Sequence, residues 1–301
     1  ELQSILRETI QRDGPMPIDQ WMSMCLGDPD HGYYTTGQPF GKLGDFTTAP
    51  EISQMFGELL GLWAAVVWQQ MGSPSYFQLI ELGPGRGTLM ADALRAAGGV
   101  PGFSDAASVH MVETSPVLID VQKKTLAQSG VQPSWHNDLD DVPNGPTILI
   151  GNEFLDALPI RQMVKDGGAW RERCVDHIGD QFQFVLGDSV DAEAIPKPFR
   201  TAPDGSVFET SPISREIVTA ISTLLRANGG AALLIDYGHT EPGMGDTLQA
   251  VKDHAYADPL KNPGQQDLTA HVDFASVVRT VVDAGARPWG PITQGDLLER
   301  L

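Results

Sequence analysis

A glycine-rich run, ELGPGRGT, is the sharpest chemical motif in the sequence and spans residues 81–88. Gly83, Gly85 and Gly87 permit a tight turn and a close approach of the backbone to a ligand. The helix predicted directly after them presents free N–H groups to the same ligand. Their spacing is GxGxG, whereas the dinucleotide fingerprint is GxGxxG. A plain strand-to-helix turn is the alternative interpretation of such a motif.

Acidic residues in and after this run indicate which ligand the turn would hold. An acidic residue directly before the glycines, here Glu81, is typical of loops that bind S-adenosylmethionine. Glu113 ends the next predicted strand, where a carboxylate can accept both ribose hydroxyls. NAD enzymes also use such an acid, and a helix-start carboxylate is a further alternative. The predicted cofactor-binding residues are Glu81, Gly83, Pro84, Gly85, Gly87, Thr88, Glu113, Asp138 and Leu139.

The last two of these residues lie in HNDLDD, residues 136–141. Asp138 can accept a hydrogen bond from the adenine amino group while Leu139 packs against the ring. Asp140 is an equal candidate for the acceptor, and a solvated acidic turn is the alternative for both.

A second constellation, NEFLDALP at residues 152–159, follows a predicted central strand. Carboxylates can grip a guanidinium, orient one nitrogen and localise the cation's charge on the others. We therefore predict Glu153 and Asp156 as a catalytic pair, with Asn152 holding their position through amide hydrogen bonds. The alternative is that both carboxylates cap a short helix that follows the strand.

Two further residues complete the predicted reaction centre. His271, in DLTAHVDF, is a candidate acceptor for the proton released after transfer, although a lone histidine is more often structural. Asp45, in GDFTTAP, is a candidate partner for a ligand amino group or a substrate cation. The alternative for that block is a lid anchored by Phe46 and Pro50.

Strands and helices alternate from residue 76 onward, which predicts an α/β fold with a doubly wound parallel sheet. The predicted strands are 77–82, 107–113, 147–154 and 231–238, and the predicted helices are 88–97, 115–128 and 214–230. Antiparallel strands interrupt this order at about 160–211, a proline-rich connector covers 196–212, and a loop-rich insertion covers 239–271. We predict a helical N-terminal cap and lid over 1–72, and a catalytic domain over 73–301 that carries both insertions.

Composition excludes several classes of function. The 301 residues include 39 acidic and 20 basic side chains, for a net charge of −19. This balance argues against nucleic acid and anionic lipid as partners and favours a cationic one. The two cysteines are 149 positions apart and no metal-ligand pattern occurs, so we expect neither disulfide nor metal. The longest apolar run, 59–68, is about half a membrane span, so we expect no membrane insertion.

Eight ordered blocks make the sequence similar to a known family. They are CLGDPDHGYY, GDFTTAPEISQMFGELLGLW, ELGPGRGTLMAD, VETSP, NEFLDALP, IDYG, GDTLQAV and DLTAHVDF. Over nearly its whole length the chain resembles the MidA-type methyltransferases, the family of a mitochondrial complex I assembly factor that methylates arginine. The resemblance implies a class I, Rossmann-like methyltransferase fold and S-adenosylmethionine as cofactor. It further implies a protein arginine, in a subunit of complex I, as substrate.

The sequence-based prediction is therefore a protein arginine methyltransferase, in the cytoplasm if bacterial and in the mitochondrial matrix if eukaryotic. Two alternatives stay open: an assembly chaperone that binds the cofactor without turnover, and a methyltransferase for a small molecule. The sequence leaves the oligomeric state undetermined.

Overall fold

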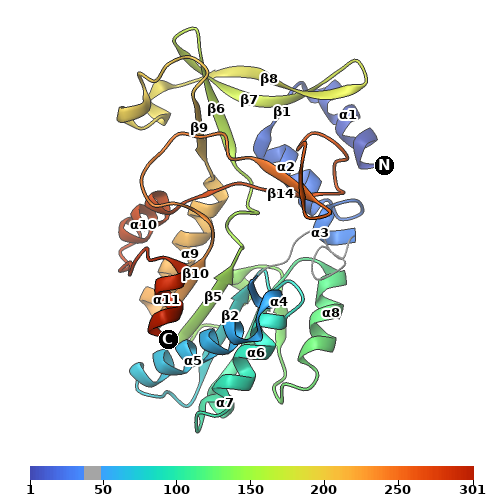
Figure 1. The fold of residues 1–301 in the computed structure, drawn as a ribbon. Helices are drawn as coiled ribbons and strands as arrows, with labels where there is room; N and C mark the ends of the chain where they lie inside the picture. The colour runs from blue at the N-terminus through green and yellow to red at the C-terminus, as the bar shows by residue number, and fades with distance from the viewer. Residues whose placement is uncertain (37–48) are drawn as a thin grey trace. The chain divides into compact units, whose positions relative to one another are not determined.

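The computed structural model describes residues 1–36 and 49–301, which form two compact units. The sheet unit comprises residues 49–155, 217–237 and 277–301, and the hairpin unit comprises 1–36, 156–216 and 238–276. Figure 1 shows the elements of both units along the chain. The predicted cap over 1–72 contributes to both units, because α1–α3 belong to the hairpin unit and α4 and α5 to the sheet unit.

The sheet unit is built on a five-stranded parallel sheet with the order β10-β5-β2-β3-β4. Its strands are β2 (Phe77–Leu82), β3 (Ala107–Val112), β4 (Ser134–His136), β5 (Thr147–Asn152) and β10 (Gly230–Ile235). All residues of β2 are buried, as expected for a parallel strand covered on both faces. The predicted parallel α/β sheet is confirmed.

Helices cover both faces of this sheet. On one face lie α5 (Gln54–Gln70), α6 (Thr88–Ala97), α7 (Phe103–Ala106) and α8 (Pro116–Leu126), and their buried side chains meet Phe77 and Leu79 of β2. On the other face, α9 (Pro212–Asn228) packs against Ile80 and Leu82 of the same strand. The period-2 alternation of β2 thus divides its side chains between two helical layers. The small helices α4 (Ala49–Ile52), α10 (Phe274–Asp283) and α11 (Gln294–Arg300) complete this part of the chain.

The hairpin unit contains an antiparallel sheet with the order β1-β7-β6-β9, to which β8 adds by pairing with β7. Its strands are β1 (Met16–Pro17), β6 (Arg161–Asp166), β7 (Ala169–Ile178), β8 (Gln181–Val190) and β9 (Val207–Thr210). The antiparallel strands predicted at about 160–211 are confirmed. The stretch 196–212, predicted as a proline-rich connector, also contains β9, which pairs with β6 in the register Val164↔Val207.

Short helices and a second sheet complete the hairpin unit. The helices are α1 (Leu2–Asp13), α2 (Ile18–Gly27) and α3 (Tyr33–Thr36). The insertion predicted as loop-rich contains β12 (Gln249–Lys252), β13 (Ala255–Ala257) and β14 (Asp267–Thr269), which form a three-stranded sheet. The two-stranded pair β11 (Gly238–His239) and β15 (Val272–Asp273) ties the two ends of this insertion together.

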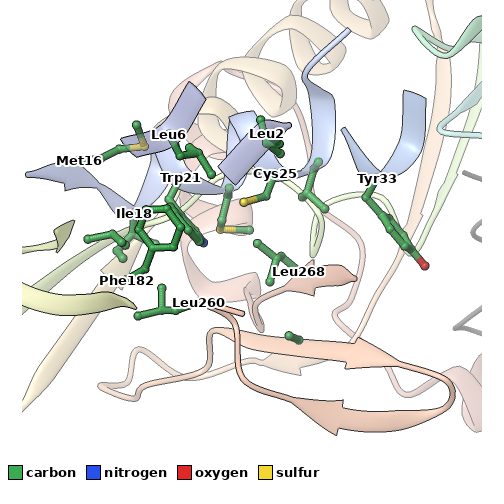
Figure 2. Close-up of a cluster of buried hydrophobic side chains, with 14 of the residues drawn as sticks. Leu2, Leu6, Met16, Ile18, Trp21, Cys25, Tyr33, Phe182, Leu260 and Leu268 are labelled. Atoms are coloured by element: carbon green, nitrogen blue, oxygen red, sulfur yellow. The ribbon is translucent and has the colours of Figure 1, made fainter. Parts of the chain in front are cut away.

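One apolar cluster joins the separate segments of the hairpin unit, and Figure 2 shows it. Trp21 of α2 is fully buried and meets Phe182 of β8 edge to face, with ring centroids 4.9 Å apart. The indole N–H of Trp21 donates to the carbonyl of Pro259 at 3.1 Å, so its polar atom is satisfied in the core. Leu6 and Leu268 lie in the same cluster. Burial of these side chains therefore holds the N-terminal helices to both insertions.

Within the sheet unit, α5 and α6 approach each other closely through two glycines. A Cβ built on Gly61 would lie 2.2 Å from the carbonyl oxygen of Ala93, and one on Gly57 would lie 2.7 Å from Cβ of Asp92. Neither position has room for a side chain. Because α6 begins at the glycine-rich turn, this contact also sets where that turn lies in the unit.

We expect Gly61→Ala to destabilise the protein by about 1–3 kcal/mol, the usual range for forcing extra atoms into a packed contact. Equilibrium denaturation in urea measures the change. Gly27→Ala is the matched control, since a Cβ on this helical glycine meets nothing within 4 Å. An unfolding midpoint for Gly61→Ala equal to that of the unsubstituted chain would contradict the role assigned to this contact.

Candidate cofactor and methyl-transfer site

The carboxyl ends of the parallel strands bring four of the predicted segments to one edge of the sheet. Leu82 of β2 pairs with Val112 of β3 and with Gly151 of β5, and Asn152 of β5 pairs with Ile235 of β10. The strands therefore end nearly level with one another. Open α/β sheets bind ligands at this edge, beside the strand where the order reverses. Here that strand is β2, and the glycine-rich turn follows it directly.

The glycine-rich turn adopts a backbone that side chains disfavour. Gly83, Gly85 and Gly87 have φ values of 57°, 54° and 79°, in the left-handed region. A Cβ on Gly83 would lie 2.8 Å from Cδ2 of Phe154, so the turn packs directly on the segment after β5. Gly87 stands at the N-cap of α6, and its N–H donates to the carbonyl of Pro84 at 2.8 Å. The turn therefore needs glycine for its backbone shape and, at Gly83, for space.

Glu81 is a buried carboxylate beside this turn, and only 3% of its surface is exposed. Its Oε2 atom is buried without a hydrogen-bond partner in the part of the chain that the structure describes. Burial raises the pKa of Glu81 to about 8, the charge of Glu113 adds to the rise, and the backbone N–H of Met90 opposes it. The carboxyl group is thus held largely protonated near neutral pH and keeps unused hydrogen-bonding capacity.

Glu113 is also buried, but its carboxylate is well supplied with donors. The backbone N–H of Ser115 donates to Oε1 at 2.9 Å, and the amide of Gln122 donates to Oε2 at 3.0 Å. Burial raises the pKa of Glu113, while these N–H groups and that of Thr114 oppose the rise. A carboxylate has about four acceptor positions, so Glu113 can also accept ligand hydroxyls.

The adenine candidates lie at the start of a short 3-10 turn, Leu139–Asp141. Asp138 is exposed and caps this turn, since its Oδ1 accepts the backbone N–H of Asp140 at 3.0 Å. Leu139 is half-buried and packs against the apolar cluster under α9. The role of Asp138 and Leu139 toward adenine stays a prediction.

The segment after β5 is held in a strained turn rather than a helix. Residues 153–160 contain only turns and bends before β6 begins, so the alternative in which Glu153 and Asp156 cap a helix is wrong. Glu153 has a φ of 47°, which is uncommon for a residue with a side chain and concentrates at functional sites. Its backbone N–H donates to the carbonyl of Ile235 at 2.8 Å. The amide of Asn152 lies 3.4 Å from its Oε1.

Asp236, at the end of β10, is a positioning residue that the sequence analysis did not select. Its Oδ2 accepts the backbone N–H of Leu155 and its Oδ1 accepts that of Tyr237, both at 2.9 Å. The carboxylate therefore fixes the turn that carries Glu153 from the neighbouring strand. The signal in the sequence was an acidic residue at a strand end, in IDYG.

Asp156 and His271 belong to the hairpin unit, whereas Glu153 belongs to the sheet unit. The carbonyl of Asp156 accepts the backbone N–H of Ala270 at 2.9 Å, so the NEFLDALP and DLTAHVDF blocks meet within the hairpin unit. Asp156 is buried and His271 is exposed. The backbone N–H of His271 donates to Oγ1 of Thr247 at 2.9 Å. Their catalytic roles stay predictions, and Asp45 lies outside the described residues.

A tyrosine and a second buried carboxylate join this part of the hairpin unit. The hydroxyl of Tyr34 donates to Oδ1 of Asp267 at 2.7 Å. Burial raises the pKa of Tyr34 well above its usual value, and the charges of Asp267 and Asp156 raise it further. Three of the ordered sequence blocks thus contribute Tyr34, Asp156 and Asp267 to one polar group, in which both carboxylates are buried.

Residues 1–36 and 49–301 hold no group of three or more His, Cys, Asp or Glu side chains placed to bind a metal ion. Nor do they include a helix with the length and apolar character needed to cross a bilayer.

Comparison with known proteins identifies the family. The model of a family of S-adenosyl-L-methionine-dependent methyltransferases matches residues 59–292. The chain belongs to this family. This methyltransferase is 38% identical to a Xenopus tropicalis protein named protein arginine methyltransferase NDUFAF7, mitochondrial, over 97% of this chain and 73% of that protein. Its identity to the human protein of the same name is 38%, over 97% of this chain and 71% of that protein.

A solved structure agrees with this assignment. A protein from Burkholderia thailandensis, solved bound to S-adenosyl-homocysteine, superposes with a TM-score of 0.81 at 30% identity. The match covers 94% of this chain and 76% of that one. The predicted family, fold class and cofactor are confirmed.

The residues present fit S-adenosylmethionine. The left-handed turn lets the backbone come close to a ligand, and the start of α6 offers N–H groups to an anionic one. The buried Oε2 of Glu81 is available to a donor, and Glu113 is a preorganised acceptor for hydroxyls. When bound, the cofactor supplies a methyl group on a positively charged sulfur.

We expect Gly85→Val to abolish measurable cofactor binding in calorimetry. A β-branched side chain is poorly compatible with a φ of 54°, and it would stand where the backbone must approach the ligand. Gly130→Val is the control for strain alone, because Gly130 has a φ of 78° and open space around it. Unchanged affinity in a folded Gly85→Val variant would contradict the assignment of the turn.

We expect Glu81 to make the stability of the ligand-free protein fall as pH rises. The folded-state pKa of about 8 exceeds the ordinary value of 4.5, so its stabilising contribution is complete below pH 4.5 and is lost as pH rises to about 8. Glu81→Gln, which stays neutral, should flatten this part of the curve. Melting temperatures measured from pH 5 to 8.5 check it, and parallel curves for the two proteins would show that Glu81 does not titrate in this range.

Proposed function

We propose that this methyltransferase transfers the methyl group to an arginine side chain of a protein substrate. The observation that carries the proposal is the identity of 37–38% to relatives named protein arginine methyltransferase, over 97% or more of this chain. The matched region includes the NEFLDALP and DLTAHVDF blocks that hold the candidate catalytic residues. We further propose a subunit of respiratory complex I as the substrate, as the family resemblance implies.

The chemistry of arginine explains why carboxylates are needed. Its guanidinium is planar, delocalised and protonated, so each nitrogen is a poor nucleophile. A carboxylate that accepts two N–H groups orients the guanidinium and draws the positive charge toward the bound nitrogens. The free nitrogen then forms a bond to the methyl carbon as the carbon–sulfur bond breaks, with the electron pair staying on sulfur. The methylated nitrogen finally loses one proton.

Glu153 is the residue we propose to orient the guanidinium in this way. Its strained φ of 47°, the hydrogen bond of its backbone to β10 and the proximity of the Asn152 amide favour this role. Such strain persists where the surrounding structure enforces it, and here Asp236 braces the turn. We keep Asp156 as its partner, Asn152 as the holder of the carboxylates, His271 as the proton acceptor and Asp45 as a second cation-binding residue, all from the sequence.

The net charge of −19 agrees with a cationic substrate segment, since an excess of carboxylates attracts such partners over long range. The site of action we propose is the cytoplasm in a bacterium or the mitochondrial matrix in a eukaryote. The support is that the relatives carry the word mitochondrial in their names.

We expect Glu153→Gln to slow single-turnover methylation by about 10²–10³-fold, the usual effect of losing one positioned electrostatic contact. Cofactor affinity should stay within about twofold, since the side chain is proposed to act on the substrate. Asp156→Asn should slow methylation to a similar extent. If the two carboxylates act as one unit, the double variant should be slowed by less than the product of the two single-variant factors. Intact-mass analysis and peptide mapping of complex I subunits incubated with enzyme and cofactor measure the rate and locate the methyl group.

The control for these variants is Asp120→Asn, which removes one negative charge from a carboxylate that is 72% exposed on α8. It should leave the rate unchanged. Normal methylation by folded Glu153→Gln would remove Glu153 from the mechanism. Methyl groups found only on small molecules would overturn arginine as substrate, and cofactor binding without any transfer would favour an assembly chaperone.

A further inference from the structure

Gln122 is a polar side chain with no exposed surface, and it lies on α8 beneath the cofactor site. Its Nε2 donates to the carbonyl of Gly85 at 2.8 Å and to Oε2 of Glu113 at 3.0 Å. Its Oε1 accepts the indole N–H of Trp135 at 2.8 Å. One amide thus connects the glycine-rich turn, the acidic residue after β3 and strand β4.

The chemistry of its partners determines how this amide is oriented. The indole N–H of Trp135 only donates, so the atom facing it must be the amide oxygen. The carbonyl of Gly85 only accepts, so the atom facing it must be the amide nitrogen. Both N–H groups of Gln122 are then used, and neither can turn away without leaving a buried polar group unpaired.

The stem of the same side chain supports the turn by packing. A Cβ built on Gly87 would lie 3.4 Å from Cγ and 3.5 Å from Cα of Gln122, which is contact distance. The carbon atoms of Gln122 therefore lie beside the turn at Gly87, and its amide bonds the turn at Gly85. One residue of α8 thus supports the turn at two points.

We propose that Gln122 is a positioning residue for the cofactor, which holds the glycine-rich turn and the Glu113 carboxylate in one fixed relation. This inference rests on the cofactor site described above and names a residue that binds no ligand atom itself. The turn and Glu113 come from different strands, and a ligand that meets both needs them at a constant separation. The amide bridge supplies that constraint.

The bridge also acts on the charge of Glu113. A donated N–H favours the ionised carboxylate, which accepts hydroxyl hydrogens on both oxygens. Within the described residues, the carboxyl of Glu81 on β2 interacts with the charge of Glu113, and the N–H groups of residues 114, 115 and 122 donate to its carboxylate. Loss of the Gln122 donor should therefore raise the pKa of Glu113.

The test uses the full chain and S-adenosyl-homocysteine as the probe, with affinity measured by calorimetry. Gln122→Met keeps the length and the apolar stem but removes all three hydrogen bonds. Because hydrogen bonds to charged groups contribute about 1.5–3 kcal/mol, we expect a loss of about 10- to 100-fold. Gln122→Glu keeps the acceptor for Trp135 and places a second carboxylate beside Glu113, so its loss should be at least as large. Gln128→Met, the same change at an exposed position after α8, should bind as the unsubstituted chain does.

A double-mutant cycle separates positioning from general damage. In a Glu113→Gln background, Gln122→Met should cost much less than in the unsubstituted chain, because the two residues act on one contact. The pH below which affinity falls should also move upward in Gln122→Met, since the pKa of Glu113 rises. Melting temperatures without ligand show whether each variant is folded.

Three outcomes would overturn the proposal: unchanged affinity in Gln122→Met, an equal loss in the Glu113→Gln background, or an unshifted pH profile with the loss explained by lower stability. Failure of the unsubstituted chain to bind S-adenosyl-homocysteine would instead contradict the cofactor site itself. Failure to methylate arginine, with normal binding, would leave the positioning role of Gln122 intact and would contradict only the proposed function.

Discussion

The left-handed turn between β2 and α6 is the constraint on which the rest of the sheet unit depends. Three glycines in five residues reverse the chain there, and the turn is packed from two directions. Phe154 lies against Gly83, and the stem of Gln122 lies against Gly87. The helix α6 starts at this turn, and Gly57 and Gly61 allow α5 to pack closely against it. The glycines of the turn and those of α5 therefore both act on the placement of α6: the first shape its start, and the second let it pack against α5.

Buried carboxylates at the same edge have opposite hydrogen-bonding environments. Glu113 receives N–H donors on both oxygens, which offsets the cost of burying a charge. Glu81 has an oxygen without a partner within the described residues, and its pKa of about 8 keeps the group largely neutral. The first arrangement fixes a carboxylate acceptor in place, as our prediction for the ribose hydroxyls requires. The second leaves one carboxyl oxygen beside the turn with unused hydrogen-bonding capacity, which the predicted cofactor contact would use.

The segment after β5, which we propose to carry the reaction, is shaped by backbone hydrogen bonds from its neighbouring strand. The N–H of Glu153 bonds to the end of β10, and Asp236 accepts the N–H of Leu155 from the same strand end. These bonds enforce a φ that an isolated glutamate would rarely adopt. In the hairpin unit, the carbonyl of Asp156 accepts from Ala270 in the same manner. The backbone of this segment is thus positioned by hydrogen bonds to the ends of neighbouring strands and not by a helix.

The sequence by itself determined the alternation of strands and helices, the position of the turn and the family. A buried strand such as 77–82 is visible in the sequence as a mostly apolar run. The GxGxG pattern directly after it predicts a turn. These signals are local, since each depends on residues that adjoin one another in the chain. Eight ordered blocks were also enough to indicate the cofactor, which the family match confirmed.

Only the tertiary structure decided the roles of Gln122 and Asp236 and the existence of β4 and β9. From the sequence, Gln122 on its helix is expected to face solvent. No neighbouring residue indicates that its hydrogen-bond partners are Gly85 and Trp135. β9 lies in a proline-rich stretch and becomes a strand because β6 supplies its hydrogen bonds. The turn after β5, expected in one alternative to lead into a helix, is held instead by β10. In each case the deciding partner is at least 13 residues away, and a hydrogen bond across that separation leaves no periodic trace in the sequence.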